Sequence, residues 1–414
     1  MLFSSSLIKL GSLGFTFLVS VLLARILSLE DFGTYAFLIS FIAVAAVLIQ
    51  LGLPPLIIRF SQERQEKLGQ NALFELWSWS LFTSLKFSAL VVLPISFFLL
   101  HAFNVGIVTT LLVLVIILLT GLGQIRGAML RAFGRVGAGF FPEHLLKPIL
   151  LIIFVFSISL LMDLVLLQVI FLSALASFIS FLYGASVLLR YPYGKGFLTH
   201  LKLNPEVRDC NDYKNKLLSF TYVSVSVVVL ANLDIIILGI IQSADEVAVY
   251  KVALSLSLMI SILYTIVNNA CQPKFSSCRN DKAETKKIYI KVTLISAIFA
   301  AFILVFVFFF GESLIALVYG ERFQSAFIPF LILSLGYTIK LFFGPALALL
   351  LMNGEESYVS RVFFFQVPFS ILVTLYMVSL MAVEGAAVAH LISIVMFNMI
   401  ICIKAIKLLR QRYY

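Results

Sequence analysis

The amino-acid sequence predicts an all-α polytopic membrane protein with about twelve transmembrane helices. Long apolar runs follow one another along the chain and are separated by short polar gaps. Hydrophobic residues make up 62% of the 414 residues and charged residues only 12%, whereas a soluble domain contains about 25% charged residues. The basic residues gather in every second gap, as in a chain that crosses a membrane repeatedly.

Each apolar run is long enough to cross the hydrocarbon core as a helix, which takes about 20 residues. The ends of the runs are placed to within about four residues. The predicted spans are, in order, residues 7–27, 35–58, 76–100, 105–126, 141–162, 164–189, 217–241, 247–272, 288–311, 327–352, 358–380 and 382–404.

The gaps differ in charge, and this difference orients the chain. One alternate set holds most of the 30 basic residues: Lys9, Arg59, Arg64, Lys67, Arg126, Arg131, Arg135, Arg190, Lys195, Lys202, Arg208, Lys214, Lys216, Lys274, Arg279, Lys282, Lys286, Lys287, Lys291, Arg361, Lys404, Lys407, Arg410 and Arg412. The other set is acidic: Glu30, Asp31, Asp163, Asp245, Glu246, Glu312, Glu321 and Glu384, with Arg322 as its one clear cation. Short loops rich in Lys and Arg stay in the cytoplasm, so we expect both termini to be cytoplasmic.

The same charge pattern indicates the partners. A net charge of +10 suits a cytoplasmic face that meets anionic membrane lipids. Nucleic-acid binding is not predicted, because no basic stripe with interleaved aromatic side chains lies in a soluble segment. The longest gap, residues 190–216, is too short for a folded domain. Any chemistry must therefore sit within or between the helices.

Catalytic, metal and disulfide sites are not predicted. His101, His144, His200 and His390 form no H-E-x-x-H or H-x-x-x-x-D pattern. The four cysteines are scattered without paired C-x-x-C spacing, so neither a zinc site nor a disulfide framework is expected. No signal peptide is evident either, since the first apolar run is long and lacks a small-x-small cleavage site.

The chain contains an internal repeat. The segment SLEDFGTYAFLIS (28–40) aligns with SADEVAVYKVALS (243–255) at a spacing of 215, and Gly134 and Pro148 align with Gly354 and Pro368 at a spacing of 220. The matches include charges, Gly and Pro, which favours a repeat over the alternative of chance similarity between apolar segments. We therefore predict two six-helix lobes, residues 1–200 and 201–414, related by a pseudo-twofold axis along the membrane normal and enclosing a cavity.

Four motifs, in this order along the chain, resemble the oligosaccharide flippases of bacterial polysaccharide biosynthesis. These motifs are RILSLEDFGTY (25–35), RGAMLRAFGRV (126–136), LVYGERFQSAFIPFLILSLG (317–336) and GPALALLLMNGEE (344–356). These flippases, the O-antigen and capsule translocases, belong to the multidrug/oligosaccharidyl-lipid/polysaccharide exporter superfamily. The resemblance implies a two-lobed transporter in the inner membrane that moves a polyprenyl-diphosphate-linked oligosaccharide to the outer leaflet. It further implies polysaccharide polymerase machinery as a partner.

Cations within the spans are the candidate substrate-binding residues, because an ionisable residue in hydrocarbon is costly and marks a pathway by default. Lys86 and Lys340 lie near the middle of their spans, and Arg25 lies toward the outer end of the first. We expect these three to attract the diphosphate of the lipid carrier; alternatively they pair structurally or, for Arg25, extend to the interface. Arg126 and Arg131 are either topogenic or meet the diphosphate as it enters from the cytoplasm.

Asp234 is the candidate for ion coupling. It is the carboxylate that lies well inside a span, apart from Glu143 near an inner end. Asp234 either takes up a proton or sodium ion or forms a buried pair with Arg25 or Lys251. No other cofactor is expected. Glu143 and Lys147 are four residues apart, which favours a local helix pair. Asn268, Asn269 and Gln272 either bind sugar hydroxyls or bridge helices.

Three other functions compete with the flippase interpretation. A membrane polymerase or ligase for the same glycans would need a long outward loop with catalytic residues, and the outward gaps are short. A drug or small-cation exporter of the same superfamily fits the helix count equally well, but the excess of buried cations favours an anionic substrate. A receptor or scaffold role is disfavoured, because no soluble module is present to bind a partner.

Overall fold

The computed structural model describes residues 2–102, 106–199, 210–278 and 281–410. These residues are helical and include no strand, which confirms the predicted all-α fold class. Ten helical segments are long and apolar enough to cross a membrane, and the shorter apolar helix Gly11–Ile26 precedes them. The last segment, Glu356–Arg410, holds two helices joined at a sharp bend at Met381 and Ala382. The described residues thus form twelve crossing segments of a multi-pass membrane protein.

The chain forms two compact units, Met1–Asp31 with Leu38–Asn232 and Phe32–Phe37 with Leu233–Tyr414. The boundary runs through two helices, so α2 and α10 each contribute to both units. The predicted division at residue 200 stays a prediction. The first part of the chain contains α1 (Leu2–Ile26), α2 (Leu29–Gln50), α3 (Leu53–Leu68), α4 (Gln70–Ala102), α5 (Ile107–Ala132), α6 (Val136–Phe141), the π-helix η1 (Pro142–Leu146), α7 (Lys147–Ser159), α8 (Leu166–Arg190), α9 (Pro192–Thr199) and α10 (Cys210–Ile241).

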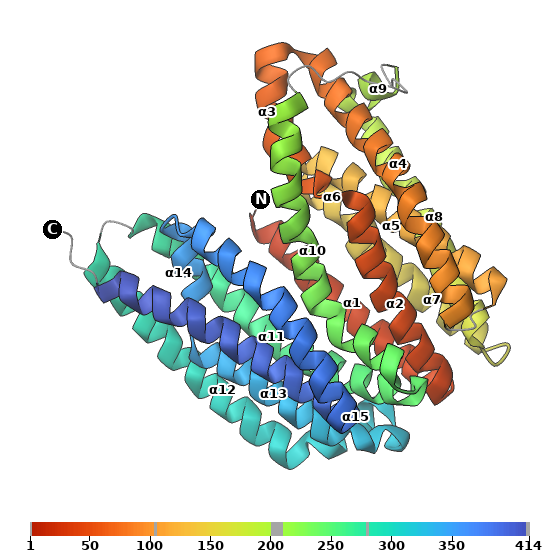
Figure 1. Cartoon of the computed structure of the whole chain (residues 1–414), viewed down its shortest axis with the longest axis vertical. Coiled ribbons are helices and arrows are strands. Elements are labelled where there is room, and N and C mark those ends of the chain that lie inside the picture. Colours follow the sequence, from red (N-terminus) through yellow and green to blue (C-terminus); the bar gives the residue numbers. More distant parts are fainter. Residues whose placement is uncertain (1, 103–105, 200–209, 279–280, 411–414) are drawn as a thin grey trace. The chain divides into compact units, whose positions relative to one another are not determined.

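The second part of the chain contains fewer and longer helices. In the second unit α13 packs against α11, α12 and α15 (Figure 1). Tyr250, Phe330 and Leu333 are buried in its interior. The helices are α11 (Ala244–Ser277), α12 (Lys282–Tyr319), the 3-10 helix η2 (Glu321–Ala326), α13 (Phe327–Phe342), α14 (Ala346–Met352) and α15 (Glu356–Arg410).

The first unit is built around α5, which packs against α3, α4 and α8 (Figure 1). Trp77 of α4 is 1% exposed and packs with Ile125 and Met129 of α5. Its indole Nε1 donates to Ser61 Oγ of α3 at 3.1 Å. Because a buried indole N–H needs an acceptor, this bond fixes α3 against α4 at the end of the unit.

The internal repeat is visible in local structure. Ser28 and Ser243 both cap a helix N-terminus, accepting from the backbone N–H three residues later, and both helices begin with two acidic residues. Gly134 and Gly354 both adopt a positive φ, of 74° and 83°, directly after a helix ends. A left-handed backbone conformation at this position favours glycine. The two matched glycines therefore end their helices in the same way.

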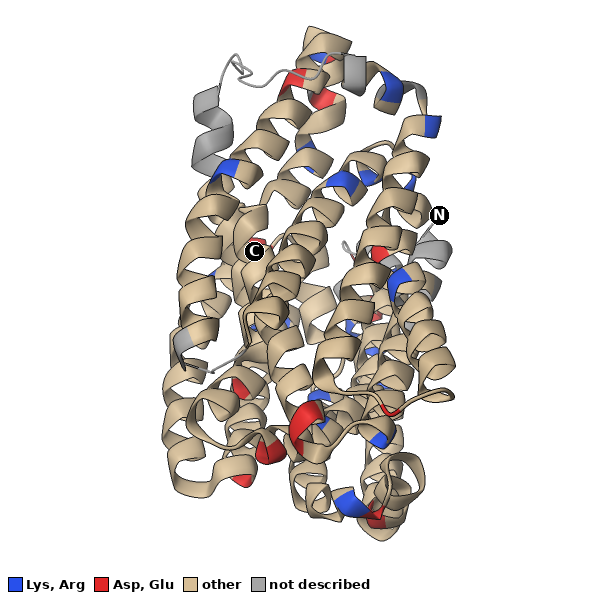
Figure 2. Ribbon diagram, turned by 90° about the vertical axis from the view of Figure 1, so that its right-hand side faces the viewer, with Lys and Arg blue, Asp and Glu red and all other residues tan. Residues whose placement is uncertain are grey.

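Lys, Arg, Asp and Glu are sparse along the helices, and most residues of the ribbon carry no charged side chain (Figure 2). Many of them lie near helix ends. Helix α11 begins with Asp245 and Glu246 and has Lys274 in its last turn, whereas α12 begins at Lys282 and carries Glu312 near its other end. This alternation agrees with the charge pattern of the gaps. The assignment of one side to the cytoplasm stays a prediction.

Candidate substrate and coupling sites

The predicted cations lie in different environments. Arg25 of α1 and Lys86 of α4 are exposed on the first unit. Arg126 and Arg131 lie five residues apart on α5 of the same unit. Lys340 of α13 is half-buried in the second unit. Arg126 and Arg131 contact different residues, because residues five apart point to different sides of a helix. The binding role of all five residues stays a prediction.

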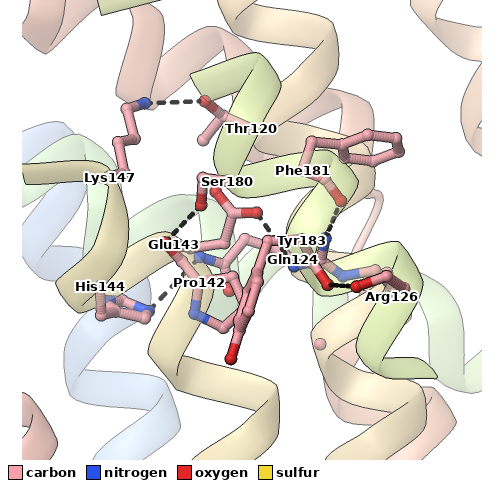
Figure 3. Close-up of polar contacts among 12 residues, drawn as sticks. Thr120, Gln124, Arg126, Pro142, Glu143, His144, Lys147, Ser180, Phe181 and Tyr183 are labelled. Carbon is pink, nitrogen blue, oxygen red and sulfur yellow. Dashed lines mark hydrogen bonds and ion pairs between the residues drawn. The ribbon is translucent and has the colours of Figure 1, made fainter. Parts of the chain in front are cut away.

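Arg126 is the centre of a buried polar group (Figure 3). Its side chain is 6% exposed, and Nη2 lies 3.1 Å from Glu143 Oε1. Nη1 donates to the carbonyl of Phe181 on α8 at 2.6 Å. Nε is buried without a hydrogen-bond partner among the described atoms. A buried charge persists when it is paired and hydrogen-bonded, so Arg126 ties α5 to both η1 and α8.

Two glycines make room for this ion pair. A Cβ on Gly184 would lie 2.0 Å from Arg126 Cζ, and a Cβ on Gly123 would lie 2.3 Å from Glu143 Oε1. Close backbone contact between Gly127 and Gly139 brings α6 onto α5, since a Cβ on either would approach the carbonyl of the other to about 2.5 Å. The ion pair thus depends on small residues that the sequence analysis did not single out.

A π-turn shapes the second helix of this site. The Lys147 N–H bonds to the Pro142 carbonyl, five residues back, and Ser180 Oγ of α8 donates to the same carbonyl. The extra residue in the turn changes which side chains share a face. Glu143 pairs with Arg126 rather than forming the expected local pair with Lys147, and Lys147 Nζ donates to Thr120 Oγ1 at 3.4 Å.

Arg131 lies in the last turn of α5. Its guanidinium carbon is 4.3 Å from the centroid of the Phe140 ring. Its Nε donates to the Gly127 carbonyl at 3.3 Å. Its Nη2 donates to the Gln124 carbonyl at 3.5 Å. Cations are favourable near a helix C-terminus and over an aromatic face, so these contacts hold Arg131 in place.

Lys340 lies beside a broken helix in the second unit. Its Nζ is 4.2 Å from the centroid of the Tyr264 ring. Two residues later α13 ends, and Gly344, with φ of 63°, separates it from α14. Tyr289 OH donates to the Phe343 carbonyl at 2.7 Å, and the Ala348 N–H donates to Asn268 Oδ1 at 3.2 Å. Asn268 therefore bridges helices, one of its two predicted roles.

Asp234 of α10 is the centre of a second buried network, and its partner is a histidine. Asp234 is 5% exposed, and its Oδ2 lies 2.5 Å from His390 Nδ1 of α15. Tyr250 OH donates to Oδ2 at 3.1 Å, and Thr374 Oγ1 donates to Oδ1 at 3.3 Å. His390 Nε2 lies 3.0 Å from Tyr337 OH. Sequence reasoning weighed Arg25 and Lys251 as partners and examined His390 only for enzyme motifs.

The comparisons with known proteins identify the family. The sequence profile described as "Polysaccharide biosynthesis protein" matches residues 2–279, which is more than half of the chain. The chain belongs to the polysaccharide biosynthesis protein family. Among curated proteins, no sequence matches the chain significantly.

Solved structures of other proteins share the fold over nearly the whole chain. An inward-facing multidrug resistance MATE family transporter of the MOP superfamily matches with a TM-score of 0.71, 13% identity and 98% of each chain covered. The lipid II flippase MurJ, in an inward closed conformation, matches with a TM-score of 0.73, 12% identity, and 97% of this chain and 87% of MurJ covered. A MOP superfamily transporter from Pyrococcus furiosus matches with a TM-score of 0.64 and 13% identity, and the match covers 99% of this chain and 94% of the transporter. The chain thus shares the fold of these MOP-superfamily transporters.

Proposed function

We propose that the protein is a flippase that moves a polyprenyl-diphosphate-linked oligosaccharide from the cytoplasmic to the outer leaflet of the bacterial inner membrane. It works by alternating access and supplies O-antigen, capsule or exopolysaccharide synthesis. Membership of the polysaccharide biosynthesis protein family supports the substrate class. The fold shared with a lipid flippase supports a transporter rather than an enzyme.

The observation that carries the proposal is the excess of cations within the membrane segments. The cations are Arg25, Lys86, Arg126, Arg131, Lys147, Lys251 and Lys340. The two carboxylates well inside the spans, Glu143 and Asp234, are each already paired within their own unit. A substrate that carries a diphosphate would supply the missing negative charge, whereas a cationic drug would add to the excess. The charge balance therefore favours a lipid-linked glycan over the substrates of a drug exporter.

Export in cells tests the role of the predicted cations. Arg25→Ala, Lys86→Ala and Lys340→Ala should each lower surface polysaccharide in a strain that lacks the protein, at matched protein levels. Lys286→Ala and Lys287→Ala on α12 are the matched controls, because their exposed cations are read as topogenic. If the control variants are as defective as the span variants, the cationic pathway is wrong.

We propose further that the transport step is coupled to protons through Asp234 and His390. The Asp234 oxygens already accept from Tyr250 and Thr374 and lie against His390, so a sodium ion would have to displace these groups to find ligands. A proton needs no such space, and an Asp–His pair can exchange one with a small movement. The alternative coupling ion, sodium, remains the competing hypothesis.

Gradients imposed on proteoliposomes distinguish the two ions. A pH gradient should accelerate transport in the wild-type protein, and Asp234→Asn and His390→Gln should each abolish this acceleration while slower, gradient-independent transport persists. Ser379→Ala, at an exposed position of α15 outside the network, is the control. Acceleration by a sodium gradient at equal pH on both sides would contradict proton coupling.

A further inference from the structure

A row of polar side chains joins α5 to the helix that packs beside it. Thr120, Gln124 and Arg131 are four and seven residues apart, so they lie on one face of α5. Each meets one side chain of the neighbouring helix: Thr120 meets Lys147, Gln124 meets His144 at 3.4 Å, and Arg131 meets the Phe140 ring. All of these residues are half-buried, so each keeps some accessible surface. We call these six residues, Thr120, Gln124, Arg131, Phe140, His144 and Lys147, the polar strip.

The polar strip carries positive charge without a carboxylate of its own. Arg131 and Lys147 are its basic residues, and His144 lies between them along the strip. The nearest carboxylate, Glu143, attracts Lys147 but forms its ion pair with Arg126, and its side chain is 6% exposed (Figure 3). One carboxylate thus balances three cations in this part of the unit. Because charges in a membrane segment need partners, this excess of cations would attract an anion.

The contacts within the polar strip are long. Lys147 to Thr120 and Gln124 to His144 each measure 3.4 Å, and Arg131 reaches backbone carbonyls at 3.3 and 3.5 Å. Hydrogen bonds between N–H and O normally measure about 2.7–3.2 Å. By contrast, Arg126 bonds the Phe181 carbonyl at 2.6 Å, and its guanidinium lies against Gly184. The strip side chains could therefore bind a better acceptor, whereas Arg126 is committed to holding the helices.

We propose that the polar strip binds a phosphate or diphosphate group, with Arg131 and Lys147 as the binding cations and Arg126 as a positioning residue. Thr120 and Arg131 are eleven residues apart, about 16 Å along the helix axis, but the Arg131 side chain reaches back to the Gln124 carbonyl. A diphosphate would meet Arg131 near the end of α5 and pass His144 to reach Lys147. That the diphosphate belongs to a lipid-linked glycan rests on the proposed function. The sequence analysis did not count Lys147 among the binding residues, because its spacing of four residues from Glu143 favoured a local helix pair.

Direct binding of inorganic pyrophosphate to the purified full-length protein in nanodiscs tests the strip. Lys147→Gln and Arg131→Gln should each weaken binding at least about tenfold, because each removes a charge-assisted hydrogen bond. Lys147→Arg, which keeps the charge, should bind within about threefold of the wild type and shows that the site is intact. Lys286→Gln on the exposed face of α12 is the control for general electrostatic attraction. Wild-type affinity in both Gln variants, or an equal loss in the control, overturns the proposal.

Competition separates the sources of the phosphate group. Polyprenyl diphosphate in the nanodisc should displace pyrophosphate, and phosphatidylglycerol at the same mole fraction should not. Equal displacement by both lipids would overturn the assignment of the strip to the carrier lipid.

Transport distinguishes the two proposals. If Lys147→Gln and Arg131→Gln leave glycan flipping unchanged, the proposed role of the strip is wrong and the proposed flippase function stands. If wild-type protein binds pyrophosphate through the strip but moves no lipid-linked glycan, the flippase is wrong and the strip stands.

Discussion

Gly184 shows how one small residue controls the buried ion pair of the first unit. Changing Gly184 to Ala would place a Cβ 2.0 Å from the guanidinium carbon of Arg126, forcing the guanidinium away from Glu143. Separating a buried ion pair leaves an uncompensated charge, so we expect Gly184→Ala to destabilise the protein by about 3–5 kcal/mol. Thermal unfolding in detergent would measure the loss.

Gly14→Ala is the matched control for this change. Gly14 lies in the interior of α1, and an added Cβ there meets nothing within 4 Å. Its replacement should be neutral or slightly stabilising, because Ala favours a helix by about 0.5–1 kcal/mol over Gly. Equal unfolding temperatures for the two variants would mean that the Arg126–Glu143 pair contributes little.

The sequence identified the residues of both buried networks more readily than their partners. Asp234 was recognised because a charge inside an apolar run stands out, whereas Arg126 lies at the end of its predicted span and was interpreted either as topogenic or as a contact for the entering diphosphate. The partner of Asp234, His390, is 156 residues away, and no periodicity connects two positions that far apart. Glu143 was assigned to Lys147 because regular helical spacing brings residues i and i+4 together, and the π-turn at Pro142 removes that regularity.

At the scale of the helix, the break between α13 and α14 depends on a tyrosine from α12. Tyr289 OH donates to the Phe343 carbonyl, which the break leaves without its helical partner. Tyr289→Phe would leave this carbonyl unsatisfied, at a cost of about 1–3 kcal/mol. Unfolding in detergent should show a lower midpoint for Tyr289→Phe than for the control Tyr376→Phe, whose side chain is exposed. An unchanged midpoint would show that the break needs no such support.

The spans themselves could be predicted, but their interruptions could not. Hydrophobic length places a helix because the bilayer sets the number of residues needed. The breaks at Leu51 and Gly52 and at Gly344 fall inside apolar runs. They arise from tertiary contacts such as the approach of the α10 backbone to Gly52, which hydropathy does not register.

At the scale of the whole molecule, the membrane orientation is the first prediction to test. Single cysteines at Lys286 and Lys202 should react with a membrane-impermeant reagent only from the cytoplasmic side. Cysteines at Asp163 and Glu312 should react only from outside. Lys202 lies outside the described residues, whereas Lys286 and Glu312 lie toward opposite ends of α12. Labelling of both α12 positions from one side would contradict the topology.

The central claim is that a cation-bearing MOP-fold transporter moves a lipid-linked glycan. Its most direct test is reconstitution of the purified protein into vesicles that contain a labelled polyprenyl-diphosphate oligosaccharide. Periodate added outside would oxidise only the glycans exposed there, so their fraction reports movement across the bilayer. The account predicts that the exposed fraction rises with time in wild-type vesicles and stays at the protein-free level with Arg131→Gln and Lys147→Gln together. A wild-type protein that leaves the glycan in place while exporting a cationic dye would contradict the account.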